Sequence, residues 1–319
     1  MTNCLPTCLP APRKWSRLRK AAKLRLTQQF IGEHKVTPSR RPTPHLRAAN
    51  LPRTYFHYYN WHTWLEGERF TTQKRKREMT YYTGSIAAVP TANKQKYIEH
   101  ATAAWPLFKS YGATRMVETW GVDVPTGKVT DFYGAVSAKD AESIVFSWIL
   151  WPDKATADAA WKKMESDPAM KKLPEMPFDG VRMIFGGFSP VFEQGNHTGA
   201  GYYQGFTLAV PEKNRAAYVE MANQGWQLFK KGGALGMIEN WGEDVPHGKQ
   251  TDFYRATKAE DGEIPLFSWI AWPDRATCDA AAKAMEAEMG DMDMSDMPFN
   301  GMHMMWAGFE PIFDSGATP

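Results

Sequence analysis

The sequence predicts an α+β fold in which two ferredoxin-like repeats pair within a single chain. Residues 82–192 recur at 203–313 with a constant offset of 121 positions and without a gap. Each copy is about 110 residues long, which is the length of a small domain rather than of a solenoid unit. Within each copy, apolar residues follow strand and helix periods in an order typical of an α+β sandwich.

The first half of each copy predicts a strand, a helix and two further strands. Residues 82–89 alternate loosely between apolar and polar side chains and therefore predict a strand. Residues 93–111 carry an apolar stripe at helical spacing and end at Gly112, a favourable helix C-terminus. Two strand-like runs follow, at 113–120 and 128–137.

The second half predicts a strand, a helix and a last strand. Residues 144–151 are almost continuously apolar, and Asp153 is a good N-cap for a helix over 153–165. The last strand covers 182–192, and a Gly-rich linker follows at 195–201. Such a sheet has helices on one face and an apolar opposite face, so the second copy can cover the first. We expect a pseudo-dimer within one chain and a monomer in solution.

The chain therefore divides into a basic extension (1–78), a first domain (79–194), the linker (195–201) and a second domain (202–319). The extension carries 17 Lys/Arg against 4 Asp/Glu, and we expect it to be mostly irregular and disordered. It has the composition of a transit peptide or of a tail that binds nucleic acid or a membrane surface. An upstream extension without a folded role is the favoured interpretation, because Met79 directly precedes the first repeat.

Composition restricts the partners of the two domains. Residues 79–319 carry 21 Lys/Arg against 31 Asp/Glu, and this acidic balance disfavours nucleic acid. The chain has three cysteines, and only Cys278 lies in a repeat, so a reducing compartment is expected. No apolar run approaches the ~18 residues that span a bilayer. These observations predict a soluble cytoplasmic protein without membrane contact.

Cofactor motifs are missing from the sequence. No P-loop, Gly-x-Gly-x-x-Gly, Cys-x-x-Cys or His-Glu-x-x-His pattern occurs. No histidine is at the same place in both copies: His100 aligns with Met221, and His303 aligns with Arg182. A site built identically in each half therefore has no histidine to bind haem or a metal, and we predict no cofactor.

Three motifs of the first copy, all retained in the second, resemble a known family. They are the runs from Glu118 to Phe132, from Phe146 to Asp153, and from Met176 through Gly187-Phe188 to Pro190. In these motifs the sequence is similar to the YbaA-like bacterial family of unknown function, which resembles the dimeric α/β-barrel superfamily. The resemblance covers about three quarters of the chain. The resemblance implies a barrel formed by obligate pairing of two domains, and it implies no particular reaction. This chain departs from the family pattern, in which a protein usually has a single domain, by its tandem copy and its basic extension.

Glu118 and Glu239 are the candidate catalytic residues. Side chains alternate along a strand, so Glu118 shares a face with Met116 and Trp120. A carboxyl group among apolar side chains has a raised pKa and can act as a general acid or base. The alternative is a carboxylate at the rim of the sheet that bonds to a backbone N–H or to Lys128.

Candidate ligand-binding residues lie in a rigid loop and in an aromatic wall. The loop runs from Asp123 to Lys128, with Asp131 just beyond it. Its Asp and Lys side chains either contact a polar ligand or only close a turn as exposed ion pairs. The aromatic side chains line a pocket between sheet and helices, or fill the core. The candidates are Trp120, Asp123, Lys128, Asp131 and Trp148 with their counterparts Trp241, Asp244, Lys249, Asp252 and Trp269.

Three functions remain open from the sequence. The leading one is small-molecule binding, with or without cofactor-independent catalysis, in a pocket between sheet and helices. The second is a non-catalytic interaction or stress-related module. The third is copper(I) binding by a Met-rich stretch of the second copy, because thioethers are soft ligands; it comprises Met289, Met292, Met294, Met297, Met302, Met304 and Met305, with His303 among them.

Overall fold

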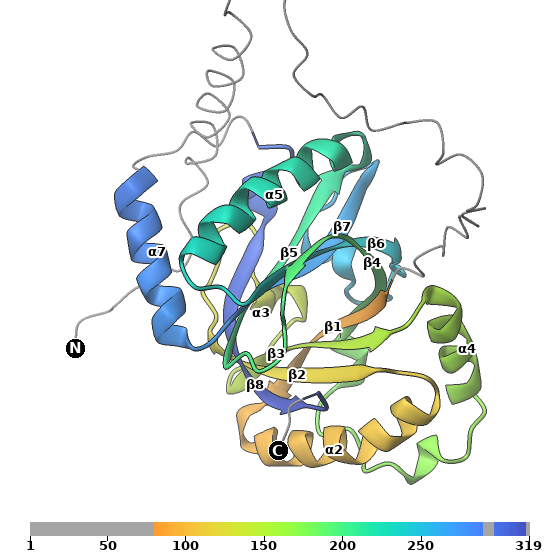
Figure 1. Cartoon of the computed structure of the whole chain (residues 1–319). Helices are drawn as coiled ribbons and strands as arrows, with labels where there is room; N and C mark the ends of the chain where they lie inside the picture. Colours follow the sequence, from red (N-terminus) through yellow and green to blue (C-terminus); the bar gives the residue numbers. More distant parts are fainter. Residues whose placement is uncertain (1–79, 290–296, 317–319) are drawn as a thin grey trace, which may run out of the picture. The chain divides into compact units, whose positions relative to one another are not determined.

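The computed structural model describes residues 80–289 and 297–316. The predictions for residues 1–78, and those for Met292 and Met294, lie outside these ranges. Within them the two repeats form one continuous structure (Figure 1).

The two repeats contain the same elements in the same order. The first comprises β1 (Tyr81–Pro90), α2 (Lys94–Ser110), β2 (Arg115–Asp123), α3 (Phe132–Ala135), β3 (Glu142–Trp151), α4 (Lys154–Met164) and β4 (Ile184–Gly195). The second comprises β5 (Tyr202–Pro211), α5 (Arg215–Lys231), β6 (Gly236–Asp244), α6 (Phe253–Ala256), β7 (Glu263–Trp272), α7 (Arg275–Met289) and β8 (Met305–Asp314). Short 3₁₀ turns precede α2, β4, α5 and β8 at Thr91–Asn93, Gly180–Arg182, Glu212–Asn214 and Gly301–His303.

Local sequence explains where the long helices begin and end. The Asp153 side chain accepts a hydrogen bond from the backbone N–H of Thr156 at 2.7 Å and so caps α4. Helix α2 ends before Gly112, whose φ of +104° lies in the left-handed region that favours glycine. Both ends agree with the sequence prediction.

The eight strands form one closed antiparallel barrel in the order β1-β3-β2-β8-β5-β7-β6-β4. Each repeat supplies four neighbouring strands, and the last strand of each repeat bonds to the other repeat. Strand β4 pairs with β1 and also with β6, while β8 pairs with β5 and also with β2. The predicted intramolecular barrel is therefore confirmed, and backbone hydrogen bonds as well as side chains hold the repeats together.

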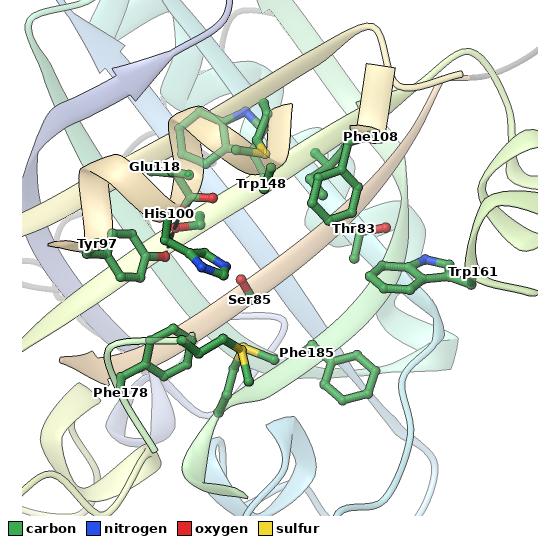
Figure 2. Close-up of a pocket in the computed structure, with 17 residues that line it drawn as sticks. Thr83, Ser85, Tyr97, His100, Phe108, Glu118, Trp148, Trp161, Phe178 and Phe185 are labelled. Carbon is green, nitrogen blue, oxygen red and sulfur yellow. Dashed lines mark hydrogen bonds between the residues drawn. The ribbon is translucent and has the colours of Figure 1, made fainter. Parts of the chain in front are cut away.

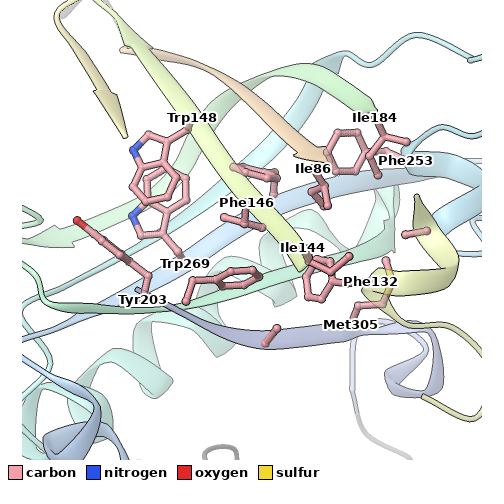
Figure 3. Close-up of a cluster of buried hydrophobic side chains, with 14 of the residues drawn as sticks. Ile86, Phe132, Ile144, Phe146, Trp148, Ile184, Tyr203, Phe253, Trp269 and Met305 are labelled. Carbon is pink, nitrogen blue, oxygen red and sulfur yellow. The ribbon is translucent and has the colours of Figure 1, made fainter. Parts of the chain in front are cut away.

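Equivalent aromatic rings from the two repeats meet inside the barrel (Figure 3). Phe146 stacks on its counterpart Phe267 with ring centroids 4.0 Å apart and planes 7° apart. Trp148 stacks on its counterpart Trp269 at 4.2 Å. All four are at most 2% exposed, so this cluster is the shared core of the two repeats.

The long helices α2, α4, α5 and α7 lie outside the barrel and create a second layer of packing (Figure 1). In the first repeat, α2 packs against β1 and β2, and α4 packs against β1 and β3. Side chains that point outward from these strands therefore lie between sheet and helices. Of the helices that the structure describes, none is long and apolar enough to cross a membrane.

The prediction of a strand at 128–137 is wrong. Residues 132–135 form the short helix α3, and its first backbone donors are capped by Asp131, which accepts from the N–H of Gly134 at 2.6 Å. Phe132 and Ala135, three positions apart, are both buried on one side of α3. Over so few residues, strand and helix periods resemble each other in sequence, which explains the error.

Candidate functional site

Glu118 lies between sheet and helix in the first repeat, held by two hydroxyl groups. It points outward from β2 beside Ser147, its register partner on β3. The Tyr97 hydroxyl, on the buried side of α2, donates to Glu118 Oε2 at 2.6 Å. The Ser147 hydroxyl donates to the same oxygen. The carboxyl group, carried by β2, is thereby fixed in one orientation by hydroxyl groups from two other elements, α2 and β3.

The surroundings favour the protonated form of this carboxyl group. Burial raises the pKa of Glu118 above its ordinary value, and the hydrogen bonds from Ser147 and Tyr97 only partly oppose that shift. Burial and the neighbouring Glu118 together raise the pKa of Tyr97 well above its usual range. Tyr97 therefore remains a hydrogen-bond donor, whereas Glu118 keeps its proton to a higher pH than an exposed glutamic acid does.

A cavity of about 220 Å³ lies in front of Glu118 (Figure 2). Its polar lining comprises the hydroxyl groups of Thr83, Ser85, Tyr97 and Ser147, the Glu118 carboxyl group and the His100 ring. Most of its remaining wall is apolar and includes Phe108, Met116, Trp161, Met176, Phe178, Met183 and Phe185. Trp161, Met176 and Phe185 are 40–50% exposed, so they form the mouth. The site combines apolar walls with a few polar groups, as small-molecule pockets generally do.

The second repeat retains the carboxyl cluster but changes the space around it. Tyr218 donates to Glu239 Oε2 at 2.6 Å, and burial raises the pKa of Glu239 to about 7. Phe206 occupies the position that Ser85 has in the first repeat. It lies on β5 opposite Ser268, its register partner on β7, and is only 8% exposed. It packs into the hydrophobic cluster that contains Tyr218. A large apolar side chain therefore takes up space beside Glu239 that remains open beside Glu118.

The four predicted tryptophans fall into two groups. Trp120 and Trp241 face the helices, each with a cation 5.2 Å from its ring centroid, supplied by Lys94 and Arg215 respectively.

Trp148 and Trp269 stack on each other inside the barrel, and Trp148 also borders the cavity. Trp148 is thus the one predicted ligand-binding tryptophan that reaches the Glu118 cavity in the described part of the chain.

Asp123 and Asp244 connect the two repeats instead of facing the Glu118 cavity. Asp123 accepts a hydrogen bond from Tyr202 at 2.9 Å and pairs with Arg275 at 2.5 Å.

Asp244 makes the equivalent contacts in the other direction, with the Tyr81 hydroxyl at 2.5 Å and with Lys154 at 2.6 Å. In each case a carboxylate of one repeat binds a tyrosine hydroxyl group and a cation of the other, so Asp123 and Asp244 stabilise the contact between the repeats.

The remaining loop candidates lie at the ends of α3 and α6. Asp131 and Asp252 cap these short helices through backbone N–H groups. Lys128 and Lys249 are exposed. Lys128 and Asp131 border a separate polar cavity of about 300 Å³ between the repeats. They are therefore not brought together with Glu118.

The Met-rich stretch is divided between different environments where the structure describes it. Met305 is buried in the barrel core, and Met297 and Met304 pack against the second-repeat cluster. Met302 is 54% exposed, and the His303 ring lies 3.3 Å from the side-chain nitrogen of Asn300. The described residues contain no group of three or more His, Cys, Asp or Glu side chains that could hold a metal ion.

Sequence reasoning missed most of the cavity lining, including the polar residues Tyr97, Ser147, Ser85 and His100. Tyr97 and Ser147 leave a usable signal, because each is a polar group that both copies retain within an otherwise apolar stripe or strand. Ser85 and His100 leave none, since the second copy has Phe206 and Met221 at those positions.

Comparison with known proteins establishes the family. Residues 80–180 and 201–301 each match the profile described as "Protein of unknown function (DUF1428)". The chain belongs to this family and contains its domain twice. It is 54% identical over 117 residues to the uncharacterized protein YbaA of Escherichia coli (strain K12), covering 100% of that protein and 36% of this chain. YbaA of Shigella flexneri matches equally well.

Solved structures with a similar arrangement are more distant. An anthrone oxidase-like protein aligns over 76% of this chain and 95% of its own, with a TM-score of 0.46 and 9% identity. A ferredoxin fold protein of Listeria monocytogenes, related to antibiotic biosynthesis monooxygenases, aligns over 75% and 98% with a TM-score of 0.33 and 8% identity.

Proposed function

We propose that the first repeat binds a small, neutral and largely apolar molecule in the cavity in front of Glu118, with Glu118 as its polar anchor and acid–base group. The observation that carries this proposal is a single buried carboxyl group, with a raised pKa, at the polar end of a cavity with mostly apolar walls. Perturbed carboxyl groups in cavities are frequent at functional sites.

The lining specifies the class of ligand. Among the described residues that line the cavity there is no lysine or arginine, so a carboxylate or phosphate would meet Glu118 without a compensating cation. A volume of about 220 Å³ lies below the ~300–1,000 Å³ of most ligand pockets, so the ligand is small. A one- or two-ring molecule with one hydroxyl or carbonyl group fits these limits. The cavity also favours this function over an interaction module, which needs no such cavity.

The test compares three probes of one shape: 2-naphthol, 2-naphthoate and naphthalene. Isothermal titration with the whole chain should give the order naphthol, naphthalene, naphthoate, because only naphthol combines apolar burial with a hydrogen bond to Glu118. Ser85→Phe introduces the second repeat's own residue and should abolish naphthol binding by filling the cavity.

Glu118→Leu and Glu239→Leu form the matched pair for the polar anchor, because leucine can neither donate nor accept a hydrogen bond. Glu118→Leu should weaken naphthol binding by about tenfold, since one hydrogen bond to a buried carboxyl group contributes roughly 1.4 kcal/mol. Glu239→Leu should leave it unchanged. Equal naphthol binding by the wild type and Ser85→Phe, or no binding of a neutral probe by the wild type, would refute the proposal.

A further inference from the structure

A second acid–base group faces the cavity of the first repeat. His100 lies three residues after Tyr97 on α2, so both side chains are on the same side of the helix. The ring of His100 lines the cavity together with Glu118, and Figure 2 shows it next to Glu118 and Ser85. One small ligand can therefore meet both groups.

A hydrogen bond fixes which ring nitrogen of His100 is available. His100 Nδ1 lies 2.8 Å from the carbonyl oxygen of Pro174. A carbonyl oxygen can only accept, so Nδ1 carries the proton of the uncharged ring and Nε2 keeps its lone pair. The loop that supplies this carbonyl is held to the start of α2 by Asn93, whose side chain donates to Pro177 O at 2.8 Å. The orientation of the ring is thus built into the fold.

The Glu118 carboxyl group has complementary properties. Both hydroxyl donors, Tyr97 and Ser147, bond to Oε2, so Oε1 is the oxygen that carries the proton of the neutral acid. The same two donors stabilise the carboxylate once that proton has left. Burial raises the pKa of Glu118, which keeps the acid protonated at a higher pH than an exposed glutamic acid.

We propose that this cavity catalyses keto–enol proton transfer on a small neutral ketone, with His100 as the base and Glu118 as the acid. The inference rests on the proposed function of the same site. His100 Nε2 takes a proton from the carbon next to the carbonyl group, and the C–H electron pair becomes the C=C bond. The carbonyl π pair moves to oxygen, which takes the proton from Glu118 Oε1. The enol leaves behind an imidazolium and a carboxylate, and the reverse step restores both groups without an oxidant or reductant.

The second repeat provides an internal comparison. Met221 replaces His100, so the base is missing there although Glu239 and Tyr218 are retained. Catalysis should therefore depend on residues of the first repeat. His100→Met is the corresponding test variant, because it introduces the side chain that the fold already accepts at the equivalent position.

The experiment uses 2-tetralone, a neutral two-ring ketone, with the whole chain in D₂O. Proton NMR follows loss of the C1 hydrogen signal, while isothermal titration measures binding of the same ketone. The wild type should exchange deuterium into C1 faster than buffer alone. Since general acid–base catalysis contributes ~10²–10⁴-fold, His100→Met should lower the rate above buffer by about 100-fold with affinity changed less than threefold. His100→Gln, which keeps a polar side chain, should lose the rate equally, and Glu239→Gln should retain it.

The outcomes separate the two proposals. Binding of 2-tetralone without exchange above buffer would overturn the proton-transfer mechanism and leave the binding function intact. The same conclusion would follow if His100→Met exchanged as fast as the wild type. Failure of the wild type to bind either 2-tetralone or 2-naphthol would overturn the proposed function and the mechanism with it.

Discussion

At the level of single residues, Glu239 couples folding to pH. Burial raises its pKa from the ordinary 4.5 to about 7, so between these values the folded chain holds a proton that the unfolded chain releases. Stability from this group is therefore fully present below about pH 4.5 and is lost as the pH rises towards about 7. The whole loss amounts to about 3 kcal/mol.

Glu239→Gln removes this titration while keeping a side chain of the same shape. Urea unfolding at pH 5 and pH 8 should show a smaller decrease in the free energy of unfolding for the variant than for the wild type. All other titrating groups contribute equally to both proteins. The wild-type decrease in the free energy of unfolding minus that of the variant is therefore the contribution of Glu239. Identical decreases in both proteins would show that Glu239 titrates as an exposed residue.

Asn240 is a second residue with an unusual environment. It is fully buried on the barrel side of β6, and neither polar atom of its side chain has a hydrogen-bond partner among the described residues. Its counterpart Thr119 donates to the backbone carbonyl of Phe146 at 2.6 Å. A buried polar group without a partner costs ~1–3 kcal/mol.

Asn240→Thr should therefore stabilise the protein by about 1 kcal/mol, because threonine can bond to the equivalent carbonyl of Phe267 and also favours strands. Thermal unfolding monitored by circular dichroism measures the effect. The reciprocal Thr119→Asn is the control and should lower the melting temperature. A lower melting temperature for Asn240→Thr would mean that the amide is better accommodated than its contacts indicate.

At the level of elements, most of each repeat could be predicted because its signals are local. The run 144–151 became β3, and the Asp153 cap placed the start of α4. The strand expected at 128–137 failed because the decisive interaction, Asp131 capping a four-residue helix, leaves no periodicity to detect. The secondary structure of a short segment depends on single contacts of this kind, whereas that of a long segment is predicted by a pattern that extends over many side chains.

The site could be predicted only in part for a related reason. Alternation along β2 correctly places Glu118 on one face with Met116 and Trp120, and the contact with Tyr97 shows that this face is turned towards the helices. The hydrogen bonds from Tyr97 and Ser147 depend on how α2 and β3 are placed against β2. This placement is set by tertiary packing and cannot be inferred from the local sequence of any one element. The difference between Ser85 and Phe206 is visible in the sequence, but its consequence requires knowing which face lines the cavity.

At the level of the whole molecule, the barrel makes the two repeats mutually dependent. Separating them would expose the stacked rings of Phe146 and Trp148 and leave the outer edges of β2 and β4 without partners. Large aromatic side chains bury ~150–250 Å² each, so this exposed surface is costly. Unpaired strand edges also invite association with another chain.

A fragment comprising residues 79–194 should therefore form a homodimer rather than a folded monomer. Because Phe267 is the counterpart of Phe146, a second copy of the first repeat can supply an equivalent ring and equivalent strand edges. Light scattering after size-exclusion chromatography measures the mass of the fragment. Phe146→Glu in the fragment should abolish the dimer, because it would bury a charge at the stacked position. The full-length chain, which contains both repeats, should be a monomer in the same measurement. A folded monomeric fragment would show that one repeat covers its own inner face, and that the tandem arrangement is not what stabilises it.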